Sequence, residues 1–596
     1  MRNANRNTFW AGVLVDELAR AGVGSWCACP GSRSTPIVLA AADHSGIHVF
    51  THVDERAAGF FALGLAKATG RPAAVVSTSG TAAANLVPAV VEAAQSQTPM
   101  LVLTADRPPR LRGGDANQTI DQRGLFGSYV RDAIDLGLPE MTDEALRGLR
   151  GAVARATMRA RSAPQGPVHI NLPFAKPLEP TVVPDDVPPG LIERFPLGAL
   201  GRPGDRPFTR TVRGRVPPTT GEIERLANLV SRTERGLIVA GPVPDPVRTG
   251  RAILRLAERT GYPLLADSLS GARFGPGACR WALTRYDAYL RDPAIRDGVA
   301  PELVLRFGSS PVSTAVGDLL LRHADAYGIV IDAGWRWADH RASATEYHLA
   351  DPGLFATALG DGITPLAPSP WSRLWGRLDA AAAGAMKAAS TQEPFEATCI
   401  ARLAAALPAG SQLFIGNSMP IRDLDGYAGP RDEPVGVTAN RGASGIDGAV
   451  STALGVSAAT GRPTVAILGD LTFLHDLTGL FATREDGVAV VFVVLNNDGG
   501  GIFDQLPVRD FEPAFTRHIV VPHGLDLRHA AALYGLPYER LAASDDPVPA
   551  VERALATART AIIEIRTERD HNRRARAAAL AAACGAARTV LTGDPA

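Results

Sequence analysis

Short apolar runs recur along the chain, and segments long enough to form a helix separate them. Eight runs stand out, at residues 73–76, 100–104, 237–240, 303–307, 329–332, 464–468, 488–495 and 561–565. Because these runs lack an alternation of apolar and polar residues, they are typical of parallel strands that are covered on both faces. Strands that alternate with helices in this way predict an α/β fold of doubly wound domains with parallel sheets.

Two segments rich in proline, glycine and arginine indicate linkers between domains. The first contains "VPDDVPPG" and "GRPGDRP", and the second contains "TPLAPSP" followed by an alanine-rich, helix-like piece. A chain of 596 residues is also long enough for several domains. We therefore predict a first domain at residues 1–185, a linker at 186–220, a central α/β domain at 221–363, a linker at 364–394 and a third domain at 395–596.

The first and last thirds of the chain contain a repeat. "ALGLAKATGRPAAVVSTSGT" begins at Ala62, and "ALGVSAATGRPTVAILGDLT" begins at Ala453, 391 residues later. Each copy leads from a small-residue helix through a Gly-Arg-Pro turn into a buried strand, which predicts one fold used twice with a different domain between. The first copy ends its strand in the neutral "STSGT" of residues 77–81, and the second ends in "GDL" at 469–471. We infer that the two copies bind different ends of one ligand.

Composition and charge narrow the class of protein. Lys+Arg and Asp+Glu both number 61, and this balance argues against a nucleic-acid-binding protein, which usually has a basic excess. No run approaches the ~18 apolar residues of a membrane span. The first 22 residues lack the apolar core of a signal peptide and predict an amphipathic helix, with Val13, Leu14, Leu18 and Ala21 at helical spacing. Five scattered cysteines are typical of a reducing compartment, so we expect a cytoplasmic protein.

The sequence Asn-Asn-Asp-Gly-Gly-Gly at residues 496–501, at the end of an apolar run, is an unusual feature of the last third of the chain. Asp470 follows the preceding run, 27 residues before Asn497, which is about one strand–helix–strand step. Ligands of open parallel sheets bind at the carboxyl ends of the strands, and carboxylate and amide oxygens suit Mg²⁺. The glycines free the backbone to approach a metal or a phosphate. The alternative is that these six residues form only a turn.

The pair Gly469-Asp470 and Asn496-Asn497 resembles the diphosphate–Mg²⁺ motif of thiamine-diphosphate enzymes, although Leu471 replaces the usual third glycine. The resemblance implies that Mg²⁺, or Mn²⁺ in its place, is bound by Asp470, the Asn497 side chain and the Gly499 carbonyl. It also implies cofactor contacts from Gly469, Leu471, Ser418 and Ile421.

The same resemblance implies a glutamate that activates the aminopyrimidine of thiamine diphosphate. Glu55, in "HVDERAAGFFALGLA", opens a small-residue helix ahead of the Ser/Thr-Gly turn and is the candidate for this catalytic role. The alternative is an ordinary glutamate at the first turn of a surface helix.

Four arginines lie in Gly-, Ser- or Pro-rich turns at predicted strand ends: Arg33, Arg107, Arg422 and Arg441. Arginine is the natural bidentate partner of carboxylates, so four of them predict substrates with several carboxylates. The alternative is that one or two are ordinary surface arginines in an arginine-rich chain.

Eight motifs together resemble the 2-succinyl-5-enolpyruvyl-6-hydroxy-3-cyclohexene-1-carboxylate (SEPHCHC) synthase family, the MenD family: "PGSRSTP", "HVDERAAGFFALGLAKATGRP", "TSGTAAANLVPAVVEA", "LTADRPP", "ANQTIDQ", "GNSMPIRD", "NRGASGIDG" and "NNDGGGIF". The match covers the first and last thirds of the chain. It implies a pyrimidine-binding, a central and a diphosphate-binding domain, with the cofactor between domains of two subunits in a homodimer or homotetramer.

The family reaction joins 2-oxoglutarate to isochorismate with loss of CO₂. The resemblance implies 2-oxoglutarate contacts from Ser418, Arg422 and Arg441, and an apolar wall from Ile502 and Phe503. It implies further substrate contacts from Ser32, Arg33, Arg107, Asn117 and Gln118.

Three other functions remain in view. An acetolactate-synthase-like thiamine enzyme would act on pyruvate and would not need four arginines. A Rossmann oxidoreductase has only "GVGSW" at residues 22–26 in its favour, which lacks the third glycine and follows a helix. A binding protein that had lost catalysis would be expected to lack Glu55 or Asp470, and both are present.

Overall fold

The computed structural model describes residues 4–334, 337–485 and 487–593. The chain divides into two compact units. Unit 1 comprises Met1–Gly214, Asn440–Gly461 and His475–Val488, and unit 2 comprises Arg215–Ala439, Arg462–Leu474 and Ala489–Ala596. Each unit therefore contains segments that lie far apart in the sequence. Among the described residues, no helix combines the length and the apolar character needed to cross a lipid bilayer.

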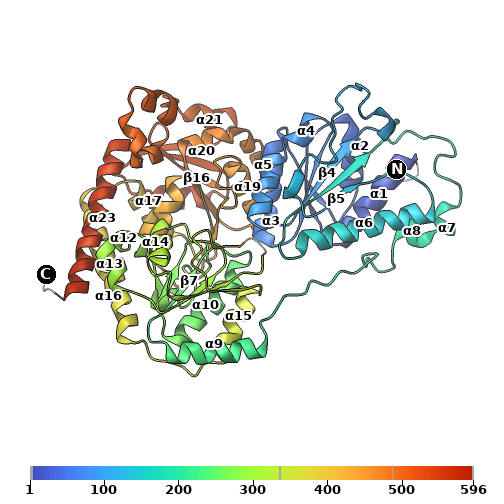
Figure 1. Ribbon diagram of the computed structural model, residues 1–596. Coiled ribbons are helices and arrows are strands. Elements are labelled where there is room, and N and C mark those ends of the chain that lie inside the picture. Colours follow the sequence, from blue (N-terminus) through green and yellow to red (C-terminus); the bar gives the residue numbers. More distant parts are fainter. Residues whose placement is uncertain (1–3, 335–336, 486, 594–596) are drawn as a thin grey trace. The chain divides into compact units, whose positions relative to one another are not determined.

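Unit 1 is built on one six-stranded parallel sheet with the order β2-β1-β3-β4-β6-β5. Its strands are β1 Ser25–Ala28, β2 His48–Thr51, β3 Ala73–Ser77, β4 Met100–Asp106, β5 Ala133–Asp135 and β6 Pro167–Pro173. Its helices are α1 Arg6–Arg20, η1 Ser32–Ser34, α2 Thr35–Ala42, α3 Glu55–Thr69, α4 Thr81–Ala84, α5 Val87–Gln95, η2 Pro109–Leu111, η3 Gly127–Tyr129, α6 Asp143–Arg161, α7 Leu191–Arg194, α8 Pro196–Leu200, α19 Ala449–Thr460 and η4 Leu477–Arg484 (Figure 1).

Helices α3 and α19 pack against each other in unit 1. A Cβ on Gly64 of α3 would lie 2.2 Å from the Thr452 carbonyl oxygen, and a Cβ on Gly455 of α19 would lie 2.2 Å from the Phe61 carbonyl oxygen. The two glycines are equivalent positions of the sequence repeat, 391 residues apart. Each copy of the repeat thus supplies the glycine that lets the other helix approach closely.

Helix α1 differs from the expected amphipathic helix, because its polar side is buried as well. It ends at Arg20, and it buries Asp16 and Glu17 together with its apolar residues. The fully buried Arg150 donates to Asp16 Oδ2 at 2.9 Å and to Glu17 Oε2 at 2.7 Å. This ion-pair cluster compensates both carboxylates, which is the condition for burying charges.

Unit 2 contains two six-stranded parallel sheets. The central sheet, in the order β12-β11-β10-β7-β8-β9, consists of β7 Gly236–Ala240, β8 Leu264–Ala266, β9 Ala282–Leu283, β10 Leu303–Phe307, β11 Tyr327–Ile331 and β12 Glu346–His348. The last sheet, in the order β14-β13-β15-β16-β18-β17, consists of β13 Gln412–Ile415, β14 Gly436–Thr438, β15 Thr464–Gly469, β16 Val491–Asn496, β17 Tyr538–Ala542 and β18 Ala561–Arg566.

The helices of unit 2 cover these two sheets. They are α9 Thr220–Arg232, α10 Pro246–Thr260, α11 Ala278–Trp281, α12 Tyr286–Tyr289, α13 Pro293–Gly298, α14 Thr314–Arg322, α15 Pro352–Asp361, α16 Pro370–Gln392, α17 Glu396–Ala406, α18 Met419–Tyr427, α20 Asp470–His475, η5 Gly501–Gln505, η6 Pro507–Asp510, η7 Thr516–Val520, α21 Arg528–Leu533, α22 Val548–Ala556 and α23 Arg569–Thr592. The long helices α16 and α23 lie side by side (Figure 1). Helix α16 fills most of the predicted second linker, which is therefore largely helical.

The strand orders confirm the predicted repeat. Counted from its own first strand, the sheet of unit 1 and the last sheet share the order 2-1-3-4-6-5, whereas the central sheet has the order 6-5-4-1-2-3. One fold is used twice, with a different α/β fold between the two copies. All eight predicted apolar runs contribute to strands, and each predicted domain span holds one sheet. The domain boundaries themselves stay a prediction.

Candidate active site

Several of the candidate site residues, among them Arg33, Ser418 and Asp470, follow strands at the point where the strand order of a sheet reverses. In the sheet of unit 1, β1 pairs with both β2 and β3, and in the last sheet β13 pairs with both β14 and β15. Chains leave in opposite directions from such a switch point, and the crevice at the carboxyl ends of these strands is where open α/β sheets bind ligands. The loops after β1, β3, β13 and β15 therefore delimit the candidate site within each unit.

Asp470 directly follows the last residue of β15, and three hydrogen-bonding groups contact its carboxylate. Gly469 pairs with Leu495 of β16, so the two strands end side by side. Asp470 Oδ1 accepts from the Leu471 amide at 2.6 Å, and Oδ2 accepts from the Gly499 amide at 2.9 Å. His523 Nε2 lies 3.3 Å from Oδ2. Burial raises the pKa of Asp470, although these hydrogen bonds and the nearby His523 oppose the shift.

The two asparagines that end β16 differ in how their side chains are bonded. Asn496 donates to Glu564 Oε1 at 2.8 Å and accepts from the Asp498 amide at 3.1 Å. Asn497 donates to Glu396 Oε1 at 2.8 Å, but its buried Oδ1 has no hydrogen-bond partner among the described residues. Asn496 is thus part of the scaffold, and Asn497 presents an open oxygen.

The glycines after Asn497 are required by close packing. Gly499 has φ +130°, and a Cβ there would lie 2.4 Å from the Val520 carbonyl oxygen. Its amide points at Asp470, and its carbonyl accepts from the Gly501 amide at 3.0 Å. A larger residue at this position would therefore separate the strand end from Asp470.

These groups fit a magnesium ion. The Asp470 carboxylate, the Asn497 Oδ1 atom and the Gly499 carbonyl are all hard oxygen donors, which Mg²⁺ prefers. Asn497 Oδ1 is a buried acceptor that an ion would satisfy. The hydrogen bond from the Gly499 amide to Asp470 brings two of the three predicted ligand residues together.

Helix α18 carries the predicted residues of the β13 loop. Ser418, with φ +69°, precedes the helix. Arg422 lies inside α18, which corrects the prediction of a turn, and it donates to the Ser418 carbonyl at 2.5 Å. The Ile421 side chain is fully buried in the apolar core. Ile502 and Phe503 lie partly buried in η5. The cofactor and substrate contacts of these residues stay predictions.

In unit 1, Glu55 is the first residue of α3, as predicted. Asp54 caps the helix by accepting from the Arg56 amide at 2.9 Å and the Ala57 amide at 3.4 Å. Glu55 is partly buried, and its Oε2 atom accepts from Asn85 Nδ2 at 3.1 Å. The carboxylate is therefore held in place while it stays accessible.

The loop after β3 gathers several of the predicted polar residues around Ser79. Arg107 donates to Ser79 Oγ, which itself donates to the Gln118 carbonyl at 3.1 Å. Gln118 Nε2 returns a hydrogen bond to the Ser79 carbonyl at 3.0 Å. The fully buried Gln122, the last residue of the ANQTIDQ motif but not among the predicted site residues, accepts from the Gly80 amide at 3.0 Å. Asn117 lies exposed beside Gln118.

Arg33 lies close to this group. With Ser32 it forms η1, after β1, and it donates to the Phe174 carbonyl at 2.7 Å. Its Nε is buried and has no hydrogen-bond partner among the described residues. Burial lowers the pKa of Arg33, and the positive charge of Arg107 lowers it further. Two neighbouring guanidinium groups favour the binding of an anion nearby, although the Asp106 carboxylate already compensates part of their charge.

Arg441 belongs to unit 1, with Arg33 and Arg107, whereas Ser418 and Arg422 belong to unit 2. The next two residues are anchored on α5, because buried Glu92 accepts from the Gly442 amide at 3.0 Å and the Ala443 amide at 2.7 Å. Lys67 also donates to Glu92 at 3.0 Å.

Comparisons with known proteins identify the family. Models of thiamine pyrophosphate enzymes match three segments: the N-terminal TPP binding domain at residues 10–125, the middle domain at 211–415 and the C-terminal TPP binding domain at 428–565. A SEPHCHC synthase of Halobacterium salinarum is 44% identical over 97% of this chain and 98% of its own length. One of Roseiflexus sp. is 45% identical over 95% and 96%. The chain belongs to the SEPHCHC synthase family.

The fold of this SEPHCHC synthase family member also resembles a more distant enzyme. The crystal structure of benzoylformate decarboxylase from Polynucleobacter necessarius superposes with a TM-score of 0.69, over 94% of this chain and 98% of that one, at 16% sequence identity. This likeness supports the three-sheet architecture.

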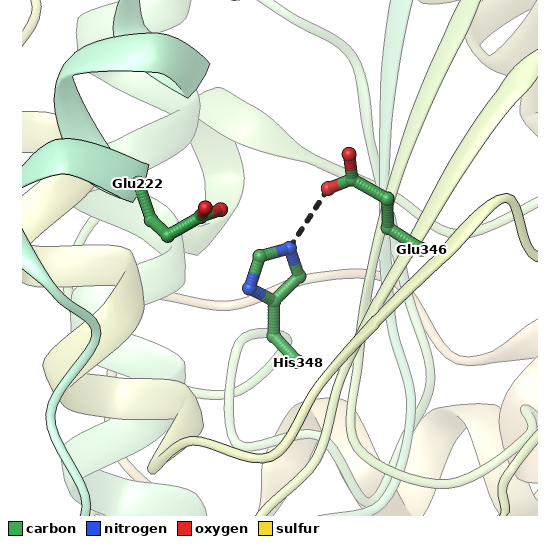
Figure 2. A group of neighbouring side chains, drawn as sticks. All are labelled: Glu222, Glu346 and His348. Carbon is green, nitrogen blue, oxygen red and sulfur yellow. Dashed lines mark hydrogen bonds and ion pairs between the residues drawn. The ribbon is translucent and has the colours of Figure 1, made fainter.

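One further group of side chains in the SEPHCHC synthase fold has the composition of a metal site. Among the described residues, Glu222, Glu346 and His348 bring ligand atoms within 4.8 Å of one another (Figure 2). Arg225 already donates to Glu222 at 2.9 Å and to Glu346 at 2.7 Å. Burial alone would raise the pKa of Glu346, but bonds from Arg225, Tyr327 and His348 outweigh it and lower it to about 2. The group is an ion-pair cluster that ties α9 to β12.

Proposed function

We propose that this protein is a transferase that decarboxylates 2-oxoglutarate and adds the succinyl group to isochorismate, with thiamine diphosphate as cofactor. The products are SEPHCHC and CO₂, in menaquinone biosynthesis. The observation that carries the proposal is the similarity over nearly the whole length to enzymes of this name. Glu55, which follows β2 of the first repeated sheet, and Asp470, which follows β15 of the second, support it.

Asp470, the Asn497 side chain and the Gly499 carbonyl would hold Mg²⁺, or Mn²⁺ in its place, and through it a diphosphate. Gly469, Leu471, Ser418 and Ile421 would contribute further cofactor contacts. Thiamine diphosphate supplies a nucleophilic carbon and an electron sink for decarboxylation. Glu55, fixed by Asn85, would hold a proton at the ring nitrogen of the aminopyrimidine, and thereby promote the tautomer that chemistry needs.

The arginines would bind the substrate carboxylates. Arg33 and Arg107, with Ser32, Asn117 and Gln118, would position isochorismate, and Arg422 with Ser418 and Arg441 would hold 2-oxoglutarate. Ile502 and Phe503 would form an apolar wall beside the reacting carbon. Each arginine–carboxylate hydrogen bond would contribute about 1.5–3 kcal/mol. Decarboxylation is favoured only where the arginines bind the distal carboxylate and leave the departing one in an apolar environment.

The protein would work as a homodimer or homotetramer in the cytoplasm. In the family that the motifs resemble, one subunit supplies the pyrimidine side of a site and another supplies the diphosphate side. Five free cysteines, two of them in or next to β1, fit a reducing compartment.

The test is a coupled assay with thiamine diphosphate, Mg²⁺ and 2-oxoglutarate, with and without isochorismate. One mole of isochorismate, followed by its absorbance, is expected to be consumed for each mole of CO₂ released. CO₂ release that leaves isochorismate untouched would contradict the synthase reaction. Turnover of pyruvate without turnover of 2-oxoglutarate would support the acetolactate-synthase-like alternative instead.

A further inference from the structure

A buried glutamate outside every motif bonds directly to the proposed metal ligand Asn497. Glu396 opens α17 and is 3% exposed. Its Oε1 atom accepts from Asn497 Nδ2 at 2.8 Å, from Thr567 Oγ1 at 2.7 Å and from Asn572 Nδ2 at 2.9 Å. Asn572 also accepts from the Glu396 amide at 3.2 Å. Residues that directly follow β16 and β18, and one from α23, thus fix this carboxylate.

This contact decides which way the Asn497 amide faces. An asparagine amide has a donor side and an acceptor side of nearly equal shape. The Glu396 carboxylate oxygen Oε1 can only accept hydrogen bonds, and it already accepts from Thr567 and Asn572. The Asn497 atom that faces it must therefore be the donor, Nδ2. Oδ1 then faces away, and it is the buried oxygen without a hydrogen-bond partner among the described residues.

The neighbouring asparagine provides an internal comparison. Asn496 Nδ2 is bonded to a buried glutamate in the same way, at 2.8 Å from Glu564 Oε1. Its Oδ1, however, accepts from the Asp498 amide at 3.1 Å. The two adjacent residues have the same kind of partner, but only Asn497 keeps its oxygen open.

We propose that Glu396 is a positioning residue for the metal site: it holds the Asn497 amide with its oxygen, and not its nitrogen, toward the cation. This inference rests on the proposed function, because it takes Asn497 as a metal ligand. Without Glu396 the amide could turn, and its N–H groups would then face the cation. Partners that orient a metal ligand typically change metal affinity by about 10–100-fold when they are removed.

The test measures Mn²⁺ binding in the presence of thiamine diphosphate, from the electron paramagnetic resonance signal of free Mn²⁺. Glu396→Met keeps the length of the side chain but offers no acceptor oxygen, and we expect its affinity to fall about 10–100-fold. Glu396→Gln keeps an oxygen for the three donors and should restore most of the affinity.

Asp339→Asn is the matched control, in the loop between β11 and β12 of the central sheet. Asp339 is buried, and it accepts from Arg306 at 2.7 Å and from the Ala344 amide at 2.8 Å. This variant loses a buried carboxylate charge as well, so it should show a similar loss of thermal stability without a loss of Mn²⁺ affinity. Glu396→Ala carries the same test should Glu396→Met not fold.

A double variant separates positioning from general damage. If Glu396 acts through Asn497, adding Glu396→Met to Asn497→Ala should lower the affinity no further than Asn497→Ala alone. Wild-type affinity in a folded Glu396→Met or Glu396→Ala protein would overturn the inference. A wild-type protein that binds no Mn²⁺ with thiamine diphosphate would instead overturn the metal site of the proposed function, and the inference with it.

Discussion

The sheet of unit 1 and the last sheet of unit 2 share one strand order but end their equivalent strands in different chemistry. Their third strands, β3 and β15, begin at equivalent positions of the sequence repeat. Residues with hydroxyl groups follow β3, and the Arg107 guanidinium donates a hydrogen bond to one of them, Ser79. After β15 comes Asp470, which accepts from the Gly499 amide, and after β16 comes Asn497 with its open oxygen. The first copy therefore suits anions, and the last copy suits a cation.

This difference separates what the fold supplies from what individual residues supply. A parallel sheet places strand ends at a switch point in either copy, whatever their chemistry. Buried glycines at equivalent positions, Gly64 and Gly455, serve packing alike in both copies. The residues just past the strands differ in chemical type between the two copies, and the proposed division of labour rests on them.

The largest expected effect comes from removing the carboxylate of the last copy. Asp470→Ala takes away a proposed metal ligand and the acceptor of the Gly499 amide. A bound cation contributes several kcal/mol of charge stabilisation, so turnover should fall by about 10³-fold or more. Mn²⁺ binding in the presence of thiamine diphosphate should be lost as well. Asp510→Ala, at an exposed aspartate of η6, is the control. Retained Mn²⁺ binding would break the assignment of the cation to the last copy.

The matching change in the first copy should separate turnover from metal binding. Glu55→Gln removes the carboxylate at the start of α3 but leaves Asn85 a side chain to bond. Loss of a general acid–base group costs about 10²–10⁴-fold in rate, so kcat should fall by that factor. Mn²⁺ affinity should stay at the wild-type value. A Glu55→Gln protein with normal turnover would exclude Glu55 as the activating carboxylate.

A smaller effect is expected at the arginines of the first copy. Arg107→Met or Arg33→Met removes a charged donor, worth about 1.5–3 kcal/mol, so kcat/KM should fall about 10–150-fold. Arg110→Met, at an exposed arginine of η2, should leave kcat/KM unchanged. Equal losses in all three variants would indicate a general charge effect and not specific carboxylate binding.

The smallest effect concerns stability and pH. His52 follows β2, is 1% exposed, and neither ring nitrogen has a hydrogen-bond partner among the described residues. Burial lowers the pKa of His52 from 6.5 to about 4. The unfolded chain therefore binds the proton first as pH falls, so the stability due to neutral His52 is complete above pH 6.5 and is lost toward pH 4.

His52→Phe should accordingly flatten the fall in unfolding temperature between pH 7.5 and pH 5. The contribution is about 3 kcal/mol at most. Phenylalanine is a suitable replacement, because the ring already packs against Phe61 with centroids 4.9 Å apart. Identical pH profiles for the variant and the wild type would show that His52 is protonated without cost.

Much of the fold could be predicted because buried parallel strands leave an apolar signature. The strands that escaped prediction are mainly short or at sheet edges, such as β5, β12 and β17, which are buried on one side at most. Their polar residues make these strands look like loops in the sequence. The helix α18 was also missed, so Arg422 was expected in a turn.

Candidate site residues could be proposed from the sequence where motif and chemistry coincide in a short segment, as at Asp470 and Asn497, and their roles stay predictions. Their supporting partners were not. Glu396 lies 101 residues before Asn497, and Asn85 lies 30 residues after Glu55. Only the folded chain brings such pairs together: Asn85 lies inside a quoted motif, but nothing in the sequence pairs it with Glu55, and no quoted motif contains Glu396.

The most direct test of the division of labour is complementation between two inactive variants. Glu55→Gln and Asp470→Ala proteins would be co-expressed with different affinity tags, and the doubly tagged oligomer would be assayed for isochorismate loss. If one copy of the chain supplies Glu55 and another supplies Asp470, each mixed dimer contains one intact site of two, so the doubly tagged oligomer should have about half of wild-type activity. A folded mixed oligomer without activity would contradict this account.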